Sequence, residues 1–213
     1  MKNICELQKL HLHAQRIFYL IPLLFLYAIL LPNQLLLMAD MDETEAVRVF
    51  GLAQEYLLLL ELWFQYLGVR FLLSPELREV SCCGSVVRKP VWMFGNLLVS
   101  YGAFLPYGIC LWAKSGRYAG NVPVLFFQCF VMAVLLLFAA MLLKSPLGGA
   151  ALMAGYYFLC MTHGVPQTAG LLSTGRLPQD FEKQWYVIQI FAAAVSIAAV
   201  NCMEKTRYGN LQV

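Results

Sequence analysis

Long apolar runs, separated by short segments that hold the charged residues, constrain this chain more than any other feature. Of its 213 residues, 61% are hydrophobic and only 13% are charged. A soluble domain carries close to a quarter of charged residues, and a charged side chain inside hydrocarbon is costly. A helix of about 20 residues crosses a bilayer core of roughly 30 Å. We therefore predict an all-α integral membrane protein.

Six apolar runs are predicted as transmembrane helices of a single transmembrane domain covering residues 1–213. They span residues 17–38, 49–73, 91–113, 122–143, 147–163 and 185–203. Residues 1–16 mix leucine and isoleucine with lysine and arginine, which predicts an amphipathic helix on the membrane surface. We expect His11 and His13 to be interfacial side chains of that helix.

The most charged interruption lies in residues 74–90, between the second and third runs. Ser74 and Pro75 have the features of a helix start, with a serine cap followed by proline at the first helical position. Gly84 can end this helix, and Pro90 can begin the next. The pattern predicts a short helix at the membrane boundary, which either docks to a soluble partner or only connects two helices.

The distribution of basic residues predicts the orientation, because cytoplasmic segments are enriched in Lys and Arg. With the N-terminus inside, ten of the fifteen basic residues fall on the inner side: Lys2, Lys9, Arg16, Arg70, Arg78, Arg88, Lys89, Lys144, Lys205 and Arg207. We therefore expect both termini and segment 74–90 in the cytoplasm. The expected location is the plasma (inner) membrane.

Motifs for several kinds of chemistry are missing from the sequence. The seven cysteines form no CxxC pair, and Cys82-Cys83 lacks further ligands at zinc-site spacing, so we expect no metal. No P-loop, HExxH or GxSxG motif occurs. His163 has no catalytic partner visible in the sequence. The net charge of +3 is too small to indicate nucleic-acid binding.

Two carboxylates lie within the second run, where an acid is a functional candidate. Gln54, Glu61, Gln65 and Gly68 are spaced 7, 4 and 3 residues apart, so they share one helix face. Glu61 lies near mid-membrane, and this face either lines or gates a translocation path or joins helices by hydrogen bonds. Glu55 lies nearer the outer end, where its side chain either contributes to the path or reaches water or a nearby arginine.

Small residues in the last two runs predict close helix packing. In the fifth run they are Gly148, Gly149, Ala151 and Gly155, and in the sixth they are Ala192, Ser196 and Ala199.

The architecture resembles the membrane subunit of an ABC-2-type transporter. Glu76 and Glu79, then Gly84, then Arg88-Lys89 and Gly95-Asn96-Leu97 stand in positions similar to the coupling segment of that family and the start of its third span. Residues 143–148 resemble its short turn between spans four and five. Residues 165–184 resemble its extracellular excursion before the last span.

The resemblance implies a transport subunit that is not itself an enzyme. It implies an ABC ATPase subunit that binds ATP and Mg²⁺, so no cofactor is expected in this chain, and a second membrane subunit that is the same or a homologous chain. The implied contacts with the ATPase are Glu76, Arg78, Glu79, Arg88 and Lys89. The implied activity is export of an amphipathic peptide, lipid or drug.

Two other classes of function stay open at the level of sequence. The chain is alternatively a non-transporting membrane protein, for example a bacteriocin immunity protein. It is alternatively an intramembrane enzyme that uses Glu55, Glu61 or His163.

Overall fold

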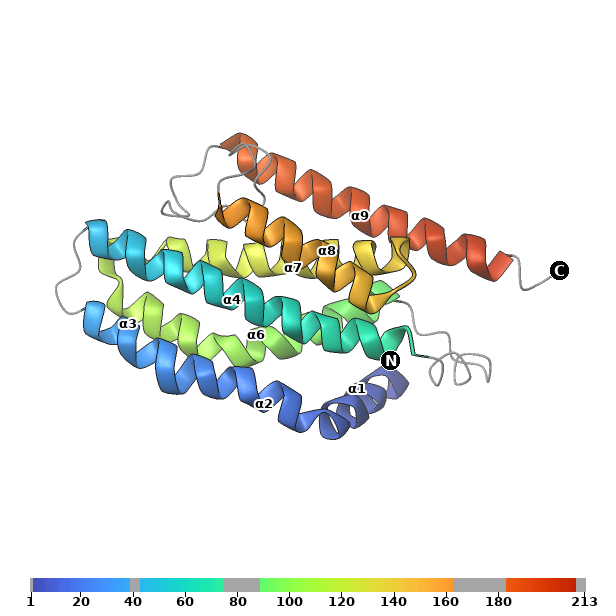
Figure 1. Ribbon diagram of the computed structural model, residues 1–213, viewed down its shortest axis with the longest axis horizontal. Coiled ribbons are helices and arrows are strands. Elements are labelled where there is room, and N and C mark those ends of the chain that lie inside the picture. The colour runs from blue at the N-terminus through green and yellow to red at the C-terminus, as the bar shows by residue number, and fades with distance from the viewer. Residues whose placement is uncertain (1, 39–42, 75–88, 163–182, 210–213) are drawn as a thin grey trace.

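The computed structural model describes residues 2–38, 43–74, 89–162 and 183–209 (Figure 1). All regular elements in these ranges are helical, as predicted. They are α1 (Lys2–Ala14), α2 (Arg16–Phe25), the π-helix η1 (Leu26–Leu30), α3 (Leu31–Leu37), α4 (Glu43–Leu72), α6 (Lys89–Lys114), the 3-10 turn η2 (Gly116–Tyr118), α7 (Asn121–Leu142), α8 (Pro146–Met161) and α9 (Lys183–Gly209).

Among the described residues, four helical segments are long and apolar enough to cross a membrane. They are Arg16–Leu37, Lys89–Lys114, Gly116–Leu142 and Lys183–Glu204, and they correspond to the first, third, fourth and sixth predicted runs. The second run is α4, whose apolar sequence is interrupted by carboxylate and amide side chains. The fifth is α8, which has only 16 residues. That α4 and α8 also cross the membrane stays a prediction.

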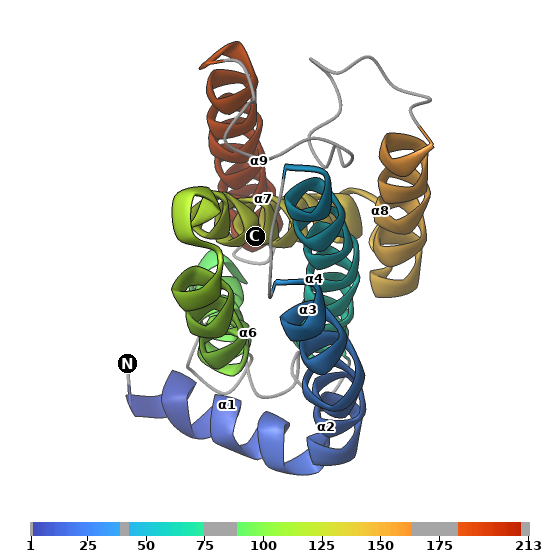
Figure 2. The ribbon, with the colours of Figure 1, turned by 90° about the vertical axis from the view of Figure 1, so that its left-hand side faces the viewer.

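Helix α7 lies at the centre of the bundle and contacts α4, α6, α8 and α9 (Figure 2). Two thirds of its most apolar window, 67%, is buried inside the protein, against 17% for Arg16–Leu37. The close contact with α8 depends on Gly149, where a Cβ atom would lie 2.6 Å from the backbone N and Cα of Ala140. The expected small-residue packing is therefore confirmed at Gly149, whereas Gly155 has open space around it.

Helix α1 packs across the end of the bundle where α4 ends and α6 begins (Figures 1 and 2). Its His11 ring is only 2% exposed. It lies against the rings of Tyr19, Phe71 and Trp92, with centroid distances of 5.8, 4.6 and 5.8 Å. The expectation of an interfacial His11 was therefore wrong, because the ring fills a gap between aromatic side chains. His13 is exposed.

Several predicted features lie outside the described residues. Glu76, Arg78, Glu79 and Arg88 of the predicted coupling helix belong to this group, as does His163. The helices that flank the coupling segment are described. Helix α4 ends and α6 begins at the same end of the bundle as α1 (Figure 1).

Candidate functional site

A polar stripe on α4 faces the interior of the bundle. Gln54 and Glu61 are fully buried, Gln65 is 1% exposed, and Gly68 is buried. The 7, 4 and 3 spacing predicted that these residues share one face, and the structure shows that this face is buried. The stripe meets polar side chains from α6 and α7.

Glu61 is the centre of a hydrogen-bonded cluster between α4 and α6. Gln65 lies one turn along α4, and its Nε2 donates to Glu61 Oε1 at 2.7 Å. Asn96 Nδ2 of α6 lies 3.2 Å from Gln65 Oε1 and 3.0 Å from the carbonyl oxygen of Phe64. The Ser100 hydroxyl lies near Glu61 and donates to the carbonyl oxygen of Leu97 at 2.9 Å. The cluster thus joins the two helices through side chains.

Gly68 allows this contact to be close. A Cβ atom at Gly68 would lie 2.6 Å from Asn96 Nδ2, so a larger residue would displace the amide. The indole nitrogen of Trp92 donates to the carbonyl oxygen of Gly68 at 3.1 Å. Two side chains of α6 therefore hydrogen-bond to the backbone of α4 within about one helical turn.

The cluster continues from Asn96 to the interface helix. Tyr19 of α2 donates to Asn96 Oδ1 at 3.4 Å, and His11 Nε2 lies 2.9 Å from the Tyr19 hydroxyl. A continuous series of side-chain contacts therefore runs from α1, through α2 and α6, to Glu61. Three contacts link Tyr19 to the carboxylate, namely Tyr19 to Asn96, Asn96 to Gln65 and Gln65 to Glu61.

A second polar layer lies nearer the other end of α4. Gln54 Nε2 donates to Gln128 Oε1 of α7 at 3.1 Å. Gln34 Nε2 of α3 donates to the carbonyl oxygen of Val49 at 3.1 Å, and the Tyr107 hydroxyl of α6 donates to Gln34 Oε1. Each amide is fully buried. Helix α4 is thus hydrogen-bonded to α3, α6 and α7.

Some buried polar atoms form no hydrogen bond with any described residue. They include Glu61 Oε2, Gln54 Oε1, Gln128 Nε2 and His11 Nδ1. Buried polar atoms in proteins are normally paired with protein groups or with water. The two polar layers can therefore hold water or a polar group of a bound molecule, or re-pair when the helices shift.

Glu55 does not join the cluster. It is half-buried, and its backbone carbonyl accepts a hydrogen bond of 2.9 Å from the Tyr157 hydroxyl of α8. A role for its carboxylate in the path stays a prediction.

Lys89, a predicted ATPase contact, is paired within the chain. Its Nζ lies 3.6 Å from Glu204 Oε1, and its backbone nitrogen donates to the same oxygen at 2.9 Å. The pair joins the start of α6 to the last part of α9. Lys89 therefore has a structural role, and contact with an ATPase stays a prediction.

Sequence reasoning missed the partners of the α4 stripe. Asn96 was noted only for its place in the resemblance, and Tyr19, Ser100 and Gln128 were not singled out. Asn96 and Ser100 are polar residues four apart within an apolar run, which was a usable signal. The position of Gln128 opposite Gln54 had no signal in the sequence, because it depends on how α4 and α7 pack.

In the described part of the chain, no group of three or more His, Cys, Asp or Glu side chains could hold a metal ion. Comparison of the chain with protein-family models, with curated proteins and with solved structures gives no match.

Proposed function

We propose that this chain is the transmembrane subunit of an ATP-driven exporter of the ABC-2 type. In this proposal all six long helical passes cross the plasma membrane, and both termini are cytoplasmic. ATP and Mg²⁺ bind to a partner ATPase, and a second membrane subunit completes the transporter. The observation that carries the proposal is the buried polar cluster around Glu61, on the helix that leads into the charged segment 74–90.

A cluster of this kind suits a helix that moves. A buried carboxylate and amides in a membrane are costly, so a static bundle is more simply built from apolar side chains. Hydrogen bonds between helices can be exchanged for others when the helices take a second arrangement, which apolar packing alone does not specify. Glu61 Oε2 and Gln54 Oε1 accept no hydrogen bond from a described residue in this arrangement, so both oxygens can accept one in another.

The contacts of α6 with α4 suggest how force would be transmitted. Trp92 and Asn96 hydrogen-bond to the α4 backbone near the end that meets segment 74–90. We expect the last turns of α4 and the first turns of α6 to move as one unit when an ATPase displaces this segment. The movement would shift the Glu61 cluster relative to α2 and α7, and so bias a two-state equilibrium of the bundle.

The substrate class follows from the proposed path. Polar layers enclosed by apolar helices suit a molecule with both polar and apolar parts, such as a peptide, a lipid or a drug. A translocated amphipathic molecule would place its polar groups at the amide and carboxylate side chains of α4.

The test is reversal of charge in the predicted coupling segment. Glu79→Lys should dissociate a co-purified ATPase or uncouple its hydrolysis from transport, while the membrane domain keeps its thermal stability. Glu43→Lys, at the opposite end of α4, is the matched control and should preserve coupling.

The proposal fails if Glu79→Lys leaves assembly and coupling unchanged, or if no ATPase co-purifies. Turnover by the purified chain without ATP would indicate an intramembrane enzyme instead. Protection of cells from a bacteriocin without any ATPase would indicate an immunity protein.

A further inference from the structure

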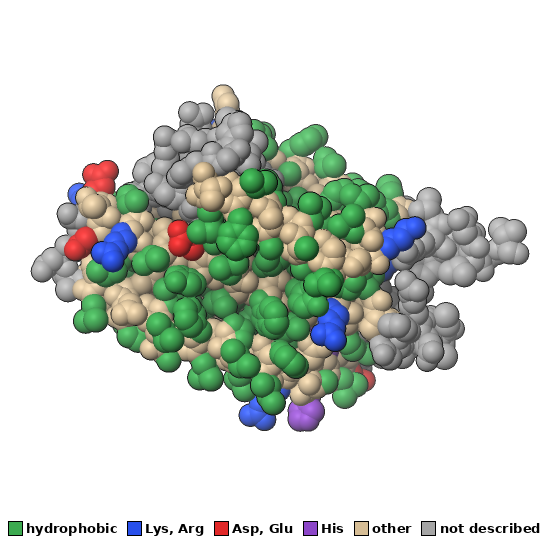
Figure 3. All heavy atoms as spheres, viewed as in Figure 1, with side chains coloured by type: hydrophobic (Ala, Val, Ile, Leu, Met, Phe, Trp, Pro, Cys, Tyr) green, Lys and Arg blue, Asp and Glu red, His purple; other side chains and the backbone are tan. Residues whose placement is uncertain are grey.

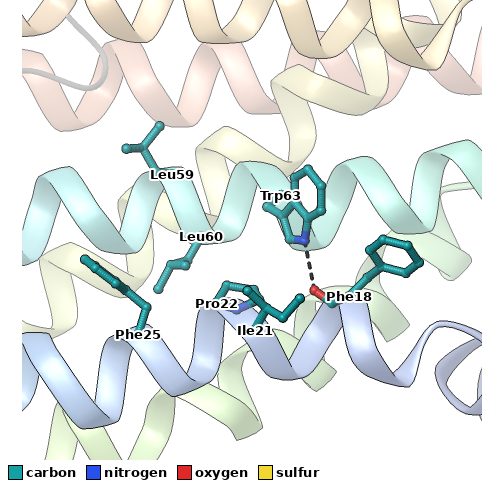
Figure 4. A pocket seen from close by; sticks show the side chains of 7 residues that line it. All are labelled: Phe18, Ile21, Pro22, Phe25, Leu59, Leu60 and Trp63. Carbon is teal, nitrogen blue, oxygen red and sulfur yellow. Dashed lines mark hydrogen bonds between the residues drawn. The ribbon is translucent and has the colours of Figure 1, made fainter.

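An apolar groove of about 400 Å³ lies on the outer surface between α2 and α4 (Figure 4). Its walls include Phe18, Ile21, Pro22 and Phe25 from α2, and Leu60 and Trp63 from α4. Every residue that lines it is apolar or aromatic. The groove therefore suits a hydrocarbon chain rather than a polar ligand.

A hydrogen bond from Trp63 to the backbone of α2 forms one end of the groove. Pro22 has no N–H group, so the carbonyl oxygen of Phe18, four residues earlier, loses its usual partner within the helix. Trp63 Nε1 donates to this oxygen at 3.0 Å, as the dashed line in Figure 4 shows. The hydrogen bond fixes the indole against α2 and closes one end of the groove.

The groove opens to the surroundings of the bundle. The Phe18 side chain is 53% exposed and the Trp63 side chain is 40% exposed. Figure 3 shows that hydrophobic side chains cover much of the face of the bundle on which α2 and α4 lie. Because α2 is part of a candidate membrane span, the molecules that can reach the groove are membrane lipids.

An arginine lies beyond the Phe18–Trp63 end of the groove. Arg70 follows Trp63 by seven residues, which places it on the same face of α4 about 10 Å further along. Its side chain is exposed and forms no ion pair in the described ranges. The guanidinium group at this end provides charge complementary to a phosphate.

We propose that this groove is a binding site for one anionic phospholipid, with an acyl chain between α2 and α4 and the headgroup phosphate at Arg70. The lining of the groove is apolar, and the cationic side chain lies beyond only one of its ends, at the end of the bundle where α1 lies. The site depends on α2 being in the membrane, and it does not depend on transport.

Quenching of Trp63 by brominated phospholipids tests the proposal. The protein is reconstituted in vesicles of phosphatidylcholine that contain either dibrominated phosphatidylglycerol or dibrominated phosphatidylcholine at equal fractions. The Trp63 signal is the difference between the wild-type chain and Trp63→Phe. We expect this signal to be quenched several-fold more strongly by the anionic lipid, and unbrominated phosphatidylglycerol should restore it.

The arginine is tested with a matched control. Arg70→Gln should equalise quenching by the two lipids, whereas Arg48→Gln, at the opposite end of α4, should retain the preference. Inorganic phosphate should leave the preference unchanged, and its loss would show that Arg70 binds free phosphate. Equal quenching of the wild-type chain by both lipids would show ordinary boundary lipid and overturn the proposal.

If Trp63→Phe does not fold, thermal stability of the wild-type chain in detergent gives a second measurement. Added phosphatidylglycerol should then raise its melting temperature more than phosphatidylcholine does. An equal effect of the two lipids would likewise overturn the proposal.

Discussion

At the scale of single residues, Glu61 is the side chain whose replacement is most informative. Glu61→Gln keeps the size and the acceptor for Gln65, so we expect the fold to be retained and transport or its pH dependence to change. Glu61→Leu leaves the Gln65 amide without its acceptor, which costs about 1–3 kcal/mol of stability, and should damage transport more. Glu55→Gln, on the same helix but outside the cluster, should have little effect on stability.

Thermal stability and transport measured on these variants separate two roles of Glu61. If Glu61 only joins helices, Glu61→Gln will transport normally and Glu61→Leu will change stability alone. Normal transport by both would remove Glu61 from the translocation path.

The hydrogen bond between Trp63 and Phe18 depends on Pro22, and a double-mutant cycle can measure this dependence. Trp63→Phe should cost about 1 kcal/mol, because the Phe18 carbonyl then has no donor in a largely apolar environment. In a Pro22→Ala background the new backbone N–H can bond to that carbonyl, so the same replacement should cost less. Unfolding in detergent gives the four free energies, and equal costs in both backgrounds would contradict the idea.

The common face of the α4 stripe was predictable from residue spacing, whereas its partners were not. Four positions at helical spacing define a face of one helix without reference to any other helix. Which side chains meet that face depends on how α6 and α7 are rotated about their axes. His11 shows the same limit, since its sequence neighbours indicate a surface helix, while Phe71 and Trp92 enclose it.

At the scale of elements, the docking of α1 should depend on pH through His11. Burial lowers the pKa of His11 from 6.5 to about 4, so the docked helix favours the neutral ring. Between these two values the state with α1 released binds more protons, and stability therefore falls as pH falls from 6.5 towards 4. Below about 4 both states are protonated, and the slope should disappear.

Melting temperatures of the detergent-solubilised chain between pH 7 and pH 4 can check this. His11→Gln should lose most of the slope, while His13→Gln, which replaces an exposed ring, should keep it. An unchanged slope in His11→Gln would assign the effect to another group.

The contact between α7 and α8 should be sensitive to one methyl group. Gly149→Ala places its Cβ against the backbone of Ala140, which cannot move without shifting α7, and overpacking of this kind costs about 1–3 kcal/mol. Gly155→Ala meets no atom within 4 Å and should be neutral or slightly stabilising. Unfolding free energies of the two variants give the comparison, and equal effects would show that the contact is not tight.

The boundaries of most helices could be predicted from the apolar runs, because length and hydropathy decide where a membrane helix begins and ends. The irregular part of Arg16–Leu37, which is a π-helix, could not be predicted in this way. Leu26 and Leu30 of the π-helix Leu26–Leu30 are buried in one apolar cluster with residues of α4 and α6, and the apolar run carries no signal for this irregularity. The contacts of α4 with α3, α6, α7 and α8 were also not evident, since its hydropathy is lower than that of these helices.

At the scale of the whole molecule, the passes of the bundle restrict the topology. Helices α2 to α3, α4, α6, α7, α8 and α9 run alternately in opposite directions (Figure 1). The connections therefore fall alternately at the two ends. If every pass crosses the membrane, ten of the fifteen basic residues lie on the side of the termini, in agreement with the usual cytoplasmic excess.

The number of crossings can be decided by labelling single cysteines, introduced in a cysteine-free background, with a membrane-impermeant maleimide in intact cells. With six crossings, Asp42→Cys, Arg117→Cys and Thr174→Cys should react from outside, and Ser145→Cys should react only after permeabilisation. If α4 and α8 lie on the surface and only four helices cross, Asp42→Cys and Thr174→Cys still react from outside, but Arg117→Cys and Ser145→Cys exchange their behaviour. The pair at positions 117 and 145 therefore distinguishes the two topologies, and a protected Asp42→Cys would contradict both.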